Sequence, residues 1–282
     1  SIMLGTSGKY NGMSISASFA KENSDNDYKY RYDDHGEIFK GSRSNSDFDI
    51  NQGLAQLNYS FNSALSMQLI TKYFYADRGI PNIVTIKNST ARQIDEDLLI
   101  MSSLNYKLNG MYLSISPSYK YSYYKYNDPN MSDGISSLTG SSDFYRYGMS
   151  GNLKTILSPN FPFQFGLEFY STQATCLNYI GERDRLQIGS FLSAEINLFK
   201  EGIFPLHIFP AVRYDYYDDF GGRVSPKIGI NIDIINNSMF LKAGLSNSFR
   251  APTFNDLYWN PGGNPDLKPE KSNSFDIGLS GY

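Results

Sequence analysis

The sequence contains little cysteine and little histidine, and both shortages limit the chemistry that the chain can perform. Its 282 residues include one cysteine, Cys176, and two histidines, His35 and His207. A single thiol cannot form an internal disulfide, and so few imidazole and thiolate groups disfavour zinc or iron centres. Metalloenzyme chemistry is therefore not expected.

Charge of either sign is also scarce and shows no bias along the chain. There are 25 basic and 28 acidic residues, which give a formal net charge of -3. Neither a basic surface for nucleic acid nor a polybasic membrane anchor is indicated, so nucleic acid is excluded as a partner. The chain starts at Ser1 without a basic and then apolar leader, so we expect any signal peptide to lie outside it.

Long apolar runs are missing as well. The mean hydropathy is -0.40, and no segment approaches the roughly 20 apolar residues of a helical membrane span. This excludes a membrane protein made of helices but leaves strands open.

Aromatic residues and a period of two dominate what is present. Aromatics make up 15% of the chain, with 23 Tyr and 19 Phe. Apolar and polar residues alternate in Met13–Ala20, Phe163–Phe169 and Ile228–Ile234, as in strands with one apolar face. We count about thirteen such strands, most of about 10 to 16 residues, which is long for a soluble sheet and suits a tilted membrane strand.

The connections between these strands alternate between short and long. Asn and Gly, which tolerate the positive φ of tight turns, occur in the short links at 11–12, 61–63, 109–110, 158–160, 200–202 and 236–237. The long links fall at about 24–46, 78–91, 128–141, 176–183, 218–222 and 251–270. Short turns on one side and long loops on the other are typical of outer-membrane barrels, with the loops extracellular and the turns periplasmic.

Aromatic and charged residues sort in the same way. Phenylalanines lie beside the short turns and tyrosines lie toward the long loops, which predicts two aromatic girdles at the membrane interfaces. The phenylalanines are Phe61, Phe161, Phe163, Phe199 and Phe204, and the tyrosines are Tyr73, Tyr75, Tyr119, Tyr121, Tyr123, Tyr145, Tyr147, Tyr214 and Tyr216. The polar face carries many ions, as a wet or protein-filled lumen would. A soluble β-sandwich is the alternative, but its strands are usually shorter.

The strand count is odd, whereas single-chain bacterial barrels have even numbers. The last strand, from Asn273 to Tyr282, stops within its pattern. An open edge in hydrocarbon leaves backbone groups unsatisfied. We therefore expect residues 1–282 to be one partial β-barrel domain.

One segment carries a family resemblance. FRAPTFNDLYW at Phe249–Trp259, followed by GNPDLKPEKS at Gly263–Ser272, resembles a signature of TonB-dependent outer-membrane receptors, and RGIPN at Arg78–Asn82 is a weaker echo. The resemblance implies an antiparallel transmembrane barrel of 22 strands, of which this chain supplies about thirteen, without the plug domain. It also implies a TonB complex that acts through that missing plug, and a cargo such as cobalamin or a ferric siderophore.

The signature loop contains Pro252, Pro261, Pro265 and Pro269, which fix φ and remove donors. We therefore expect neither helix nor strand ladder within it. Its motif residues are Phe249, Arg250, Ala251, Pro252, Asn264, Pro265, Leu267, Pro269 and Glu270. They either brace a long hairpin or contact cargo directly.

Aromatic residues in the long loops are the candidates for cargo binding, because loops on a rigid scaffold concentrate function. These are Tyr28, Tyr30 and Tyr32 in the first long loop and Phe254, Tyr258 and Trp259 in the signature loop. The tyrosines alternatively continue a strand, and Trp259 alternatively belongs to a girdle.

No cofactor is predicted apart from structural calcium, for which acidic residues of the first long loop offer ligands. Asp25, Asp27, Asp33 and Asp34 supply the oxygens that calcium prefers, and the cobalamin-receptor branch of the family is known for loop calcium. Neighbouring Lys and Arg residues favour solvated loop charge instead.

An enzyme is not predicted. His207 is the one strand histidine and has the parity of the polar face, away from lipid, so a hydrogen-bonded luminal histidine is favoured over an acyl-transfer site. The sequence thus predicts an outer-membrane receptor that captures a large, scarce nutrient with its loops and passes it through a plug-gated lumen. A passive porin and a structural or adhesin barrel are the alternatives.

Overall fold

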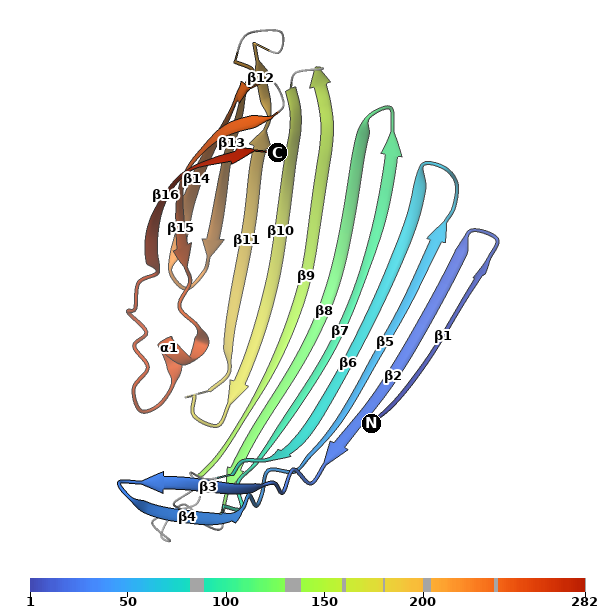
Figure 1. Ribbon diagram of the computed structural model, residues 1–282. Coiled ribbons are helices and arrows are strands. Elements are labelled where there is room, and N and C mark those ends of the chain that lie inside the picture. The colour runs from blue at the N-terminus through green and yellow to red at the C-terminus, as the bar shows by residue number, and fades with distance from the viewer. Residues whose placement is uncertain are drawn as a thin grey trace.

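The computed structural model describes residues 1–81, 89–129, 138–158, 161–179, 181–199, 204–235 and 238–281, and most of them lie in one curved antiparallel sheet (Figure 1). Each strand in the sheet pairs with its neighbours in sequence, apart from a hairpin inserted between the second and third. The sheet contains β1 (Ile2–Tyr10), β2 (Met13–Ser24), β5 (Phe48–Ser60), β6 (Leu65–Gly79), β7 (Arg92–Leu108), β8 (Met111–Asp128), β9 (Leu138–Ser158), β10 (Phe161–Cys176), β11 (Arg183–Ala194), β12 (Ile196–Leu198), β13 (Leu206–Tyr217), β14 (Gly221–Ile235), β15 (Met239–Arg250) and β16 (Glu270–Gly281).

In the described chain the path across the sheet has thirteen strands, as the alternation predicted, with β12 attached to β13. β11 and β12 are one predicted strand with a break at Glu195. Ser193 pairs with Ala211 and Ile196 pairs with Ile208, so the register is the same on both sides of the break. The break lies beside Pro210, which has no N–H to donate to the ladder.

The two faces of the sheet separate apolar from polar side chains because directly opposed residues in a ladder point the same way. On the apolar face Ile15 opposes Leu57, and Leu57 opposes Leu69. On the polar face Lys120 opposes Arg146, which opposes Thr172. The period of two therefore places one continuous apolar surface on one side of the whole sheet, as predicted.

Tight turns close one end of the sheet. Asn11 and Gly12 have φ values of 41° and 78°, and Asn109 and Gly110 have 48° and 80°. Two successive left-handed residues match the twist of the flanking strands, which explains the Asn-Gly pairs. The predicted short links at 158–160, 200–202 and 236–237 lie partly or wholly outside the described residues. We call this the short-turn end and the opposite one the long-loop end.

The predicted tyrosine girdle is a feature of the structure. All nine of its tyrosines share the apolar face and lie toward the long-loop end. Tyr119 opposes Tyr147 with ring centroids 5.3 Å apart, and Tyr121 opposes Tyr145 at 5.1 Å. Rings with a polar hydroxyl are favoured where an apolar surface meets water.

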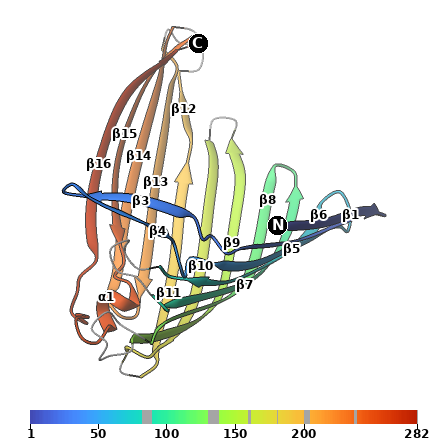
Figure 2. The same cartoon turned by 60° about the horizontal axis from the view of Figure 1, so that its bottom comes forward.

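The first long loop folds into a hairpin of its own. β3 (Lys29–Asp34) pairs with β4 (Glu37–Ser42) through a turn at His35 and Gly36, whose φ values are 52° and 96°. The prediction of a plain loop over 24–46 was therefore incomplete, because His-Gly forms the same left-handed turn as Asn-Gly. Figures 1 and 2 show the hairpin extending from the β2 and β5 side across the long-loop end toward the C-terminal strands.

The sheet curves around its polar face. Helix α1 (Phe254–Tyr258), in the loop after β15, packs on polar-face side chains of β9 and β10. A loop reaches strands that far across the sheet only through the concave side, and Figure 2 shows α1 near β11 and β16. In the part of the chain that the structure describes, α1 is the one helix, and it lacks the length and hydrophobicity of a membrane crossing.

Candidate functional site

The signature loop contains a helix, contrary to the prediction from its prolines. α1 follows the N-cap Thr253, whose Oγ1 accepts a hydrogen bond from the backbone N of Asp256 at 3.1 Å. Oδ2 of Asp256 accepts in return from the backbone N of Thr253 at 2.8 Å. This capping box satisfies two donors at the helix start. The prediction was wrong because Pro252 and Pro261 flank the helical residues and do not interrupt them.

Helix α1 buries one side against the polar face of the sheet. Phe254 forms a buried cluster with Ala174, Cys176 and Tyr179. Its ring centroid lies 6.2 Å from that of Phe144 on β9. Small and aromatic side chains at the long-loop end of β9 and β10 thus form the seat on which the signature loop rests.

The β10–β11 loop completes this seat. The hydroxyl of Tyr179 donates to Oδ1 of Asn255, and the backbone N of Asn260 donates to the carbonyl of Asn178 at 2.8 Å. Burial, with a smaller effect of the neighbouring Cys176, raises the pKa of Tyr179 to about 12. The phenol therefore stays protonated and remains a donor at physiological pH.

Arg185, near the start of β11, holds the loop from the other side. Its Nε donates to Oδ2 of Asp219 at 2.7 Å and its Nη1 donates to the carbonyl of Pro252 at 2.9 Å. The guanidinium also lies 4.7 Å from the ring centroid of Phe254. Only 11% of either charged side chain is exposed, so this ion pair is buried and geometrically fixed.

A cavity of about 500 Å³ lies between the signature loop and the polar face. This volume is within the range of small-molecule sites. Its lining combines aromatic rings, neutral hydrogen-bonding groups and three cations. The lining residues are Lys120, Ser122, Phe144, Arg146, Thr172, Tyr179, Arg185, Gln187, Tyr217, Ala251, Thr253, Phe254 and Asn255. We call it the α1 cavity.

The α1 cavity is cationic. Among the described residues that line it, none is acidic. The nearest ion-pair partner of Lys120 is Asp97, whose Oδ1 lies 3.6 Å from Nζ. Arg146 donates to Oε1 of Gln187 at 3.3 Å and stacks 4.1 Å from the centroid of the Tyr170 ring. Among the described residues, Arg146 therefore has no carboxylate partner, and Lys120 has one that is itself exposed.

Farther toward the short-turn end, one arginine of the polar face is neutralised by two carboxylates. Arg213 donates to Glu168 at 2.6 Å and to Asp215 at 2.7 Å, and Asp215 is buried. His207 contacts Oδ1 of Asn197 through Nδ1, which confirms the predicted hydrogen-bonded histidine on this face.

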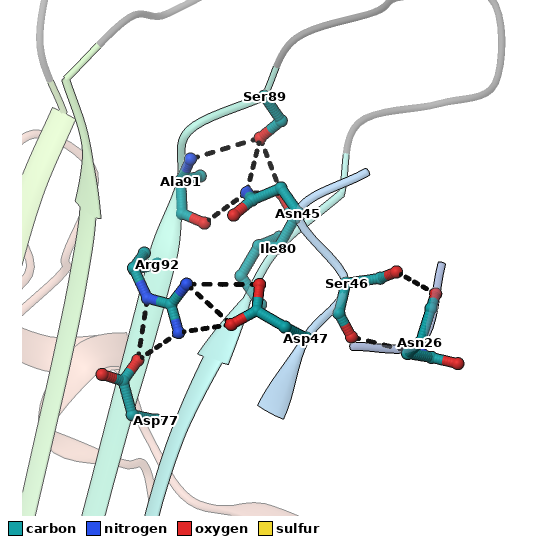
Figure 3. Close-up of polar contacts among 9 residues, drawn as sticks. All are labelled: Asn26, Asn45, Ser46, Asp47, Asp77, Ile80, Ser89, Ala91 and Arg92. Carbon is teal, nitrogen blue, oxygen red and sulfur yellow. Dashed lines mark hydrogen bonds and ion pairs between the residues drawn. The ribbon is translucent and has the colours of Figure 1, made fainter. Parts of the chain in front are cut away.

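A second polar cluster joins the first two long loops of the sheet (Figure 3). Nδ2 of Asn45 donates to the carbonyls of Ala91 at 2.7 Å and Ile80 at 3.1 Å. The backbone N of Gly79 donates to the carbonyl of Asp47 at 2.8 Å. The side-chain amide of Asn45 thus links the first long loop to the second, at a point where no strand pairing joins them.

Arg92 adds an ionic part to the same cluster. Its guanidinium contacts Asp47 at 3.0 Å and Asp77 at 2.9 Å (Figure 3). Nearby, Ser46 and Asn26 exchange two hydrogen bonds of 2.6 Å and 3.2 Å. We call the group of Asn45, Asp47, Asp77, Ser89 and Arg92 the loop clasp. It fixes the base from which the β3–β4 hairpin projects.

The structure separates the aromatic residues that the sequence proposed for cargo binding. Tyr30 and Tyr32 share one face of β3, where the ring of Tyr30 covers Gly41 and that of Tyr32 lies 6.5 Å from Phe39. Tyr28 precedes the strand and is exposed. Within the signature loop, Phe254 lines the α1 cavity, Tyr258 lies 4.5 Å from the guanidinium of Arg183, and Trp259 is exposed. Their role in cargo binding stays a prediction.

The other motif residues shape the loop. Nη1 of Arg250 lies 3.0 Å from Oε1 of Glu270 across the β15–β16 ladder. The backbone N of Asn264 donates to the carbonyl of Asp256 at 2.9 Å, and Leu267 N donates to Asn264 O at 3.1 Å. Phe249 contacts Tyr217, Ala251 lines the cavity and Pro269 is buried, whereas Pro265 is exposed.

The acids proposed for calcium do not converge. Asp33 and Asp34 are consecutive on β3, so their side chains leave opposite faces. Asp33 accepts from Gly36 N at 2.9 Å, and Asp34 pairs with His35 at 2.8 Å. Asp25 and Asp27 precede the strand. Within the described residues, no group of three or more His, Cys, Asp or Glu side chains is arranged to hold a metal. Calcium binding stays a prediction.

Sequence reasoning did not single out the residues that organise both sites. Arg185, Asn45 and Arg92 lie at or near strand ends, where periodicity gives no signal. Arg146 is one of the polar-face ions, which the alternation predicted only as a group. The curvature of the sheet and the inward path of the signature loop bring the residues of each site together. Local spacing in the sequence encodes neither of them.

A curved antiparallel sheet with an apolar outer face and a polar inner face is the wall of a transmembrane β-barrel. The family model described as TonB dependent receptor-like, beta-barrel, matches residues 4–282. The chain therefore belongs to this family, which is an outer-membrane family of receptors. The predicted family and fold class are confirmed.

Solved structures share this fold. The siderophore receptor PirA from Pseudomonas aeruginosa has a TM-score of 0.74 at 14% identity, over 99% of this chain and 48% of that one. The FrpB iron transporter from Neisseria meningitidis has a TM-score of 0.74 at 11% identity, over 99% of this chain and 50% of that one. These likenesses show the fold.

Curated relatives match over a shorter segment. The vitamin B12 transporter BtuB of Photobacterium profundum is 41% identical over 71 residues, which are 25% of this chain and 12% of the relative. A BtuB of Vibrio vulnificus is 40% identical over 72 residues, 26% of this chain and 12% of the relative. The chain thus spans about half the length of its structural relatives and matches about an eighth of these curated ones.

Proposed function

We propose that the chain forms barrel wall and loops of an outer-membrane receptor that imports a large, scarce nutrient, either cobalamin or a ferric siderophore. The α1 cavity is the single observation that carries the proposal. It places cations, amides and aromatic rings together on the concave face at the long-loop end, as a cargo site at the mouth of a lumen requires.

In this proposal the long-loop end faces the outside of the cell and the short-turn end faces the periplasm. The apolar face contacts outer-membrane lipid. Cargo is captured between the β3–β4 hairpin and α1, and a plug closes the lumen until the TonB complex pulls on it. The relatives support the two cargo classes, because they include vitamin B12 transporters and a siderophore receptor.

Growth tests this function. A strain that lacks the receptor is complemented with the full-length gene and grown on limiting cobalamin, and separately on limiting iron with defined siderophores. We expect rescue on one source and loss of that rescue when TonB is deleted. Rescue that persists without TonB would refute active uptake and support a passive porin. No rescue on any of these sources would refute both cargo classes.

A further inference from the structure

We infer that the α1 cavity binds an anionic group of the cargo, and that Lys120 and Arg146 are the cations that bind it. The chemical class is a metal chelate with a net negative charge on its donor oxygens, in preference to a neutral chelate. The inference rests on the proposed function, because it assigns a charge to the cargo of that receptor.

The position of the two cations carries the argument. Lys120 on β8 and Arg146 on β9 are directly opposed in the antiparallel ladder. Like charges in directly opposed positions destabilise a sheet. Asp97 contacts Lys120 at 3.6 Å, but both side chains are about half exposed, so screening leaves this contact weak. An anion bound between the two cations removes their repulsion.

Other arginines of the same face show what neutralisation looks like in this protein. Arg213 contacts two carboxylates within 2.7 Å. Arg185, at the edge of the α1 cavity, contacts Asp219 at 2.5 Å. In the described chain, Arg146 has no carboxylate within ion-pair distance, although it is directly opposed to Lys120 in the ladder. Arg146 therefore differs from these two arginines, and Lys120 beside it has only the exposed contact with Asp97.

The rest of the lining suits a chelate that is polar at one side and aromatic at the other. Gln187, Thr253 and Asn255 supply neutral hydrogen-bonding groups, and Phe144 and Tyr217 supply rings. Apolar walls with a few convergent polar groups are typical of small-molecule sites. A cation pair in such a setting selects for charge as well as shape.

The β3–β4 hairpin at the long-loop end also places two cations opposite each other. Arg31 and Lys40 are directly opposed on β3 and β4, and Lys29 shares their face. All three side chains are exposed, and none forms an ion pair with a described residue. Figures 1 and 2 show this hairpin spanning the long-loop end on the way to α1. A second opposed cation pair on the entry path is consistent with an anionic cargo.

The test measures binding to the purified full-length receptor in detergent. The probes are the ferric complex of a tris-catecholate, which is anionic, and the ferric complex of a trihydroxamate, which is neutral, both with radioactive iron in equilibrium dialysis. We expect K120Q/R146Q to weaken binding of the anionic complex by about tenfold or more. Added salt should weaken the wild type far more than the double variant.

Two control variants separate charge from folding. Lys154→Gln removes an exposed cation from the same strand and face as Arg146, outside the α1 cavity, and should leave binding unchanged. K120R/R146K keeps both charges and should retain binding of the anionic complex, even if the glutamine pair fails to fold.

Two results would overturn the inference. One is binding of the anionic complex that is equal in K120Q/R146Q and the wild type. The other is wild-type binding of the neutral complex that equals or exceeds that of the anionic one. If TonB-dependent growth on cobalamin is found together with no binding of the anionic complex, the inference fails and the proposed function stands. Growth that is independent of TonB refutes the function, while dialysis still decides the charge of the ligand.

Discussion

Arg185 and Pro252 lie 67 residues apart in the sequence, yet Nη1 of Arg185 donates to the carbonyl oxygen of Pro252 at 2.9 Å. Pro252 is the residue before the N-cap of α1, so this bond fixes where the helix begins relative to β11. Asp219 orients the guanidinium, and the ring of Phe254 packs beside it. The inward path of the signature loop therefore depends on one arginine of the wall.

Replacing Arg185 by Ala should release the signature loop. Asp219 would be left buried without its cation, and loss of one partner of a buried pair costs about 3–5 kcal/mol. We expect rapid proteolytic cleavage between residues 251 and 269 in an otherwise folded receptor. K154A serves as the control, because that lysine is exposed and remote from the loop. Equal protease resistance of R185A and the wild type would show that the arginine does not anchor the loop.

Gly79→Ala should open the loop clasp. A Cβ at this position would lie 2.6 Å from the backbone C and O of Asn45, and backbone cannot move aside as a side chain can. Hydrogen exchange should become faster at the amides of Gly79 and Ile80, which donate to Asp47 and Ala91. Gly8→Ala is the matched control, since a Cβ there meets nothing within 4 Å. Unchanged exchange in G79A would contradict the clasp.

Asp256 should make the α1 cap sensitive to acid. The backbone N–H of Thr253 and then its side chain hold the pKa of this carboxyl below its usual 3.8, against the opposing effect of burial, and the charge of Arg250 lowers it slightly further. A depressed folded pKa adds stability that is present above the usual value and is lost as the pH falls through the folded value.

Fluorescence of Trp259, the single tryptophan of the chain, reports on this cap. We expect an acid transition below pH 3.8 in the wild type. In Asp256→Asn the emission at neutral pH should already resemble the acid form, and the transition should disappear. An identical acid transition in both proteins would assign it to another group.

Removing the hairpin cations should slow the capture of an anionic chelate. Exposed charges act mainly on encounter, so R31Q/K40Q should lower the association rate several-fold at low salt and have a smaller effect on dissociation. Stopped-flow quenching by the ferric tris-catecholate measures both rates. R31K/K40R keeps the charge and should associate at the wild-type rate. A change confined to dissociation would instead place these residues in the bound complex.

How much the sequence determined differs between the strands and the sites. Alternation across Phe163–Phe169 placed Phe165 and Leu167 on the apolar face, because a period of two is a local property of extended backbone. Asn11-Gly12 and Asn109-Gly110 located their turns for an equally local reason. The signature loop revealed the family. Its prolines led to a prediction of no helix, which was wrong because Thr253 and Asp256 form a capping box that starts one between them.

The sequence by itself determined the strands, their two faces and the membrane setting, since each depends on residues that are close together in the sequence, within one strand or one hairpin. Only the tertiary structure decided that Arg185 meets Pro252, that Lys120 opposes Arg146, and that Asn45 joins two loops. These contacts depend on strand register and on the curvature of the whole sheet. Both are set by the sum of many ladder and packing interactions, and no single segment of the sequence contains them.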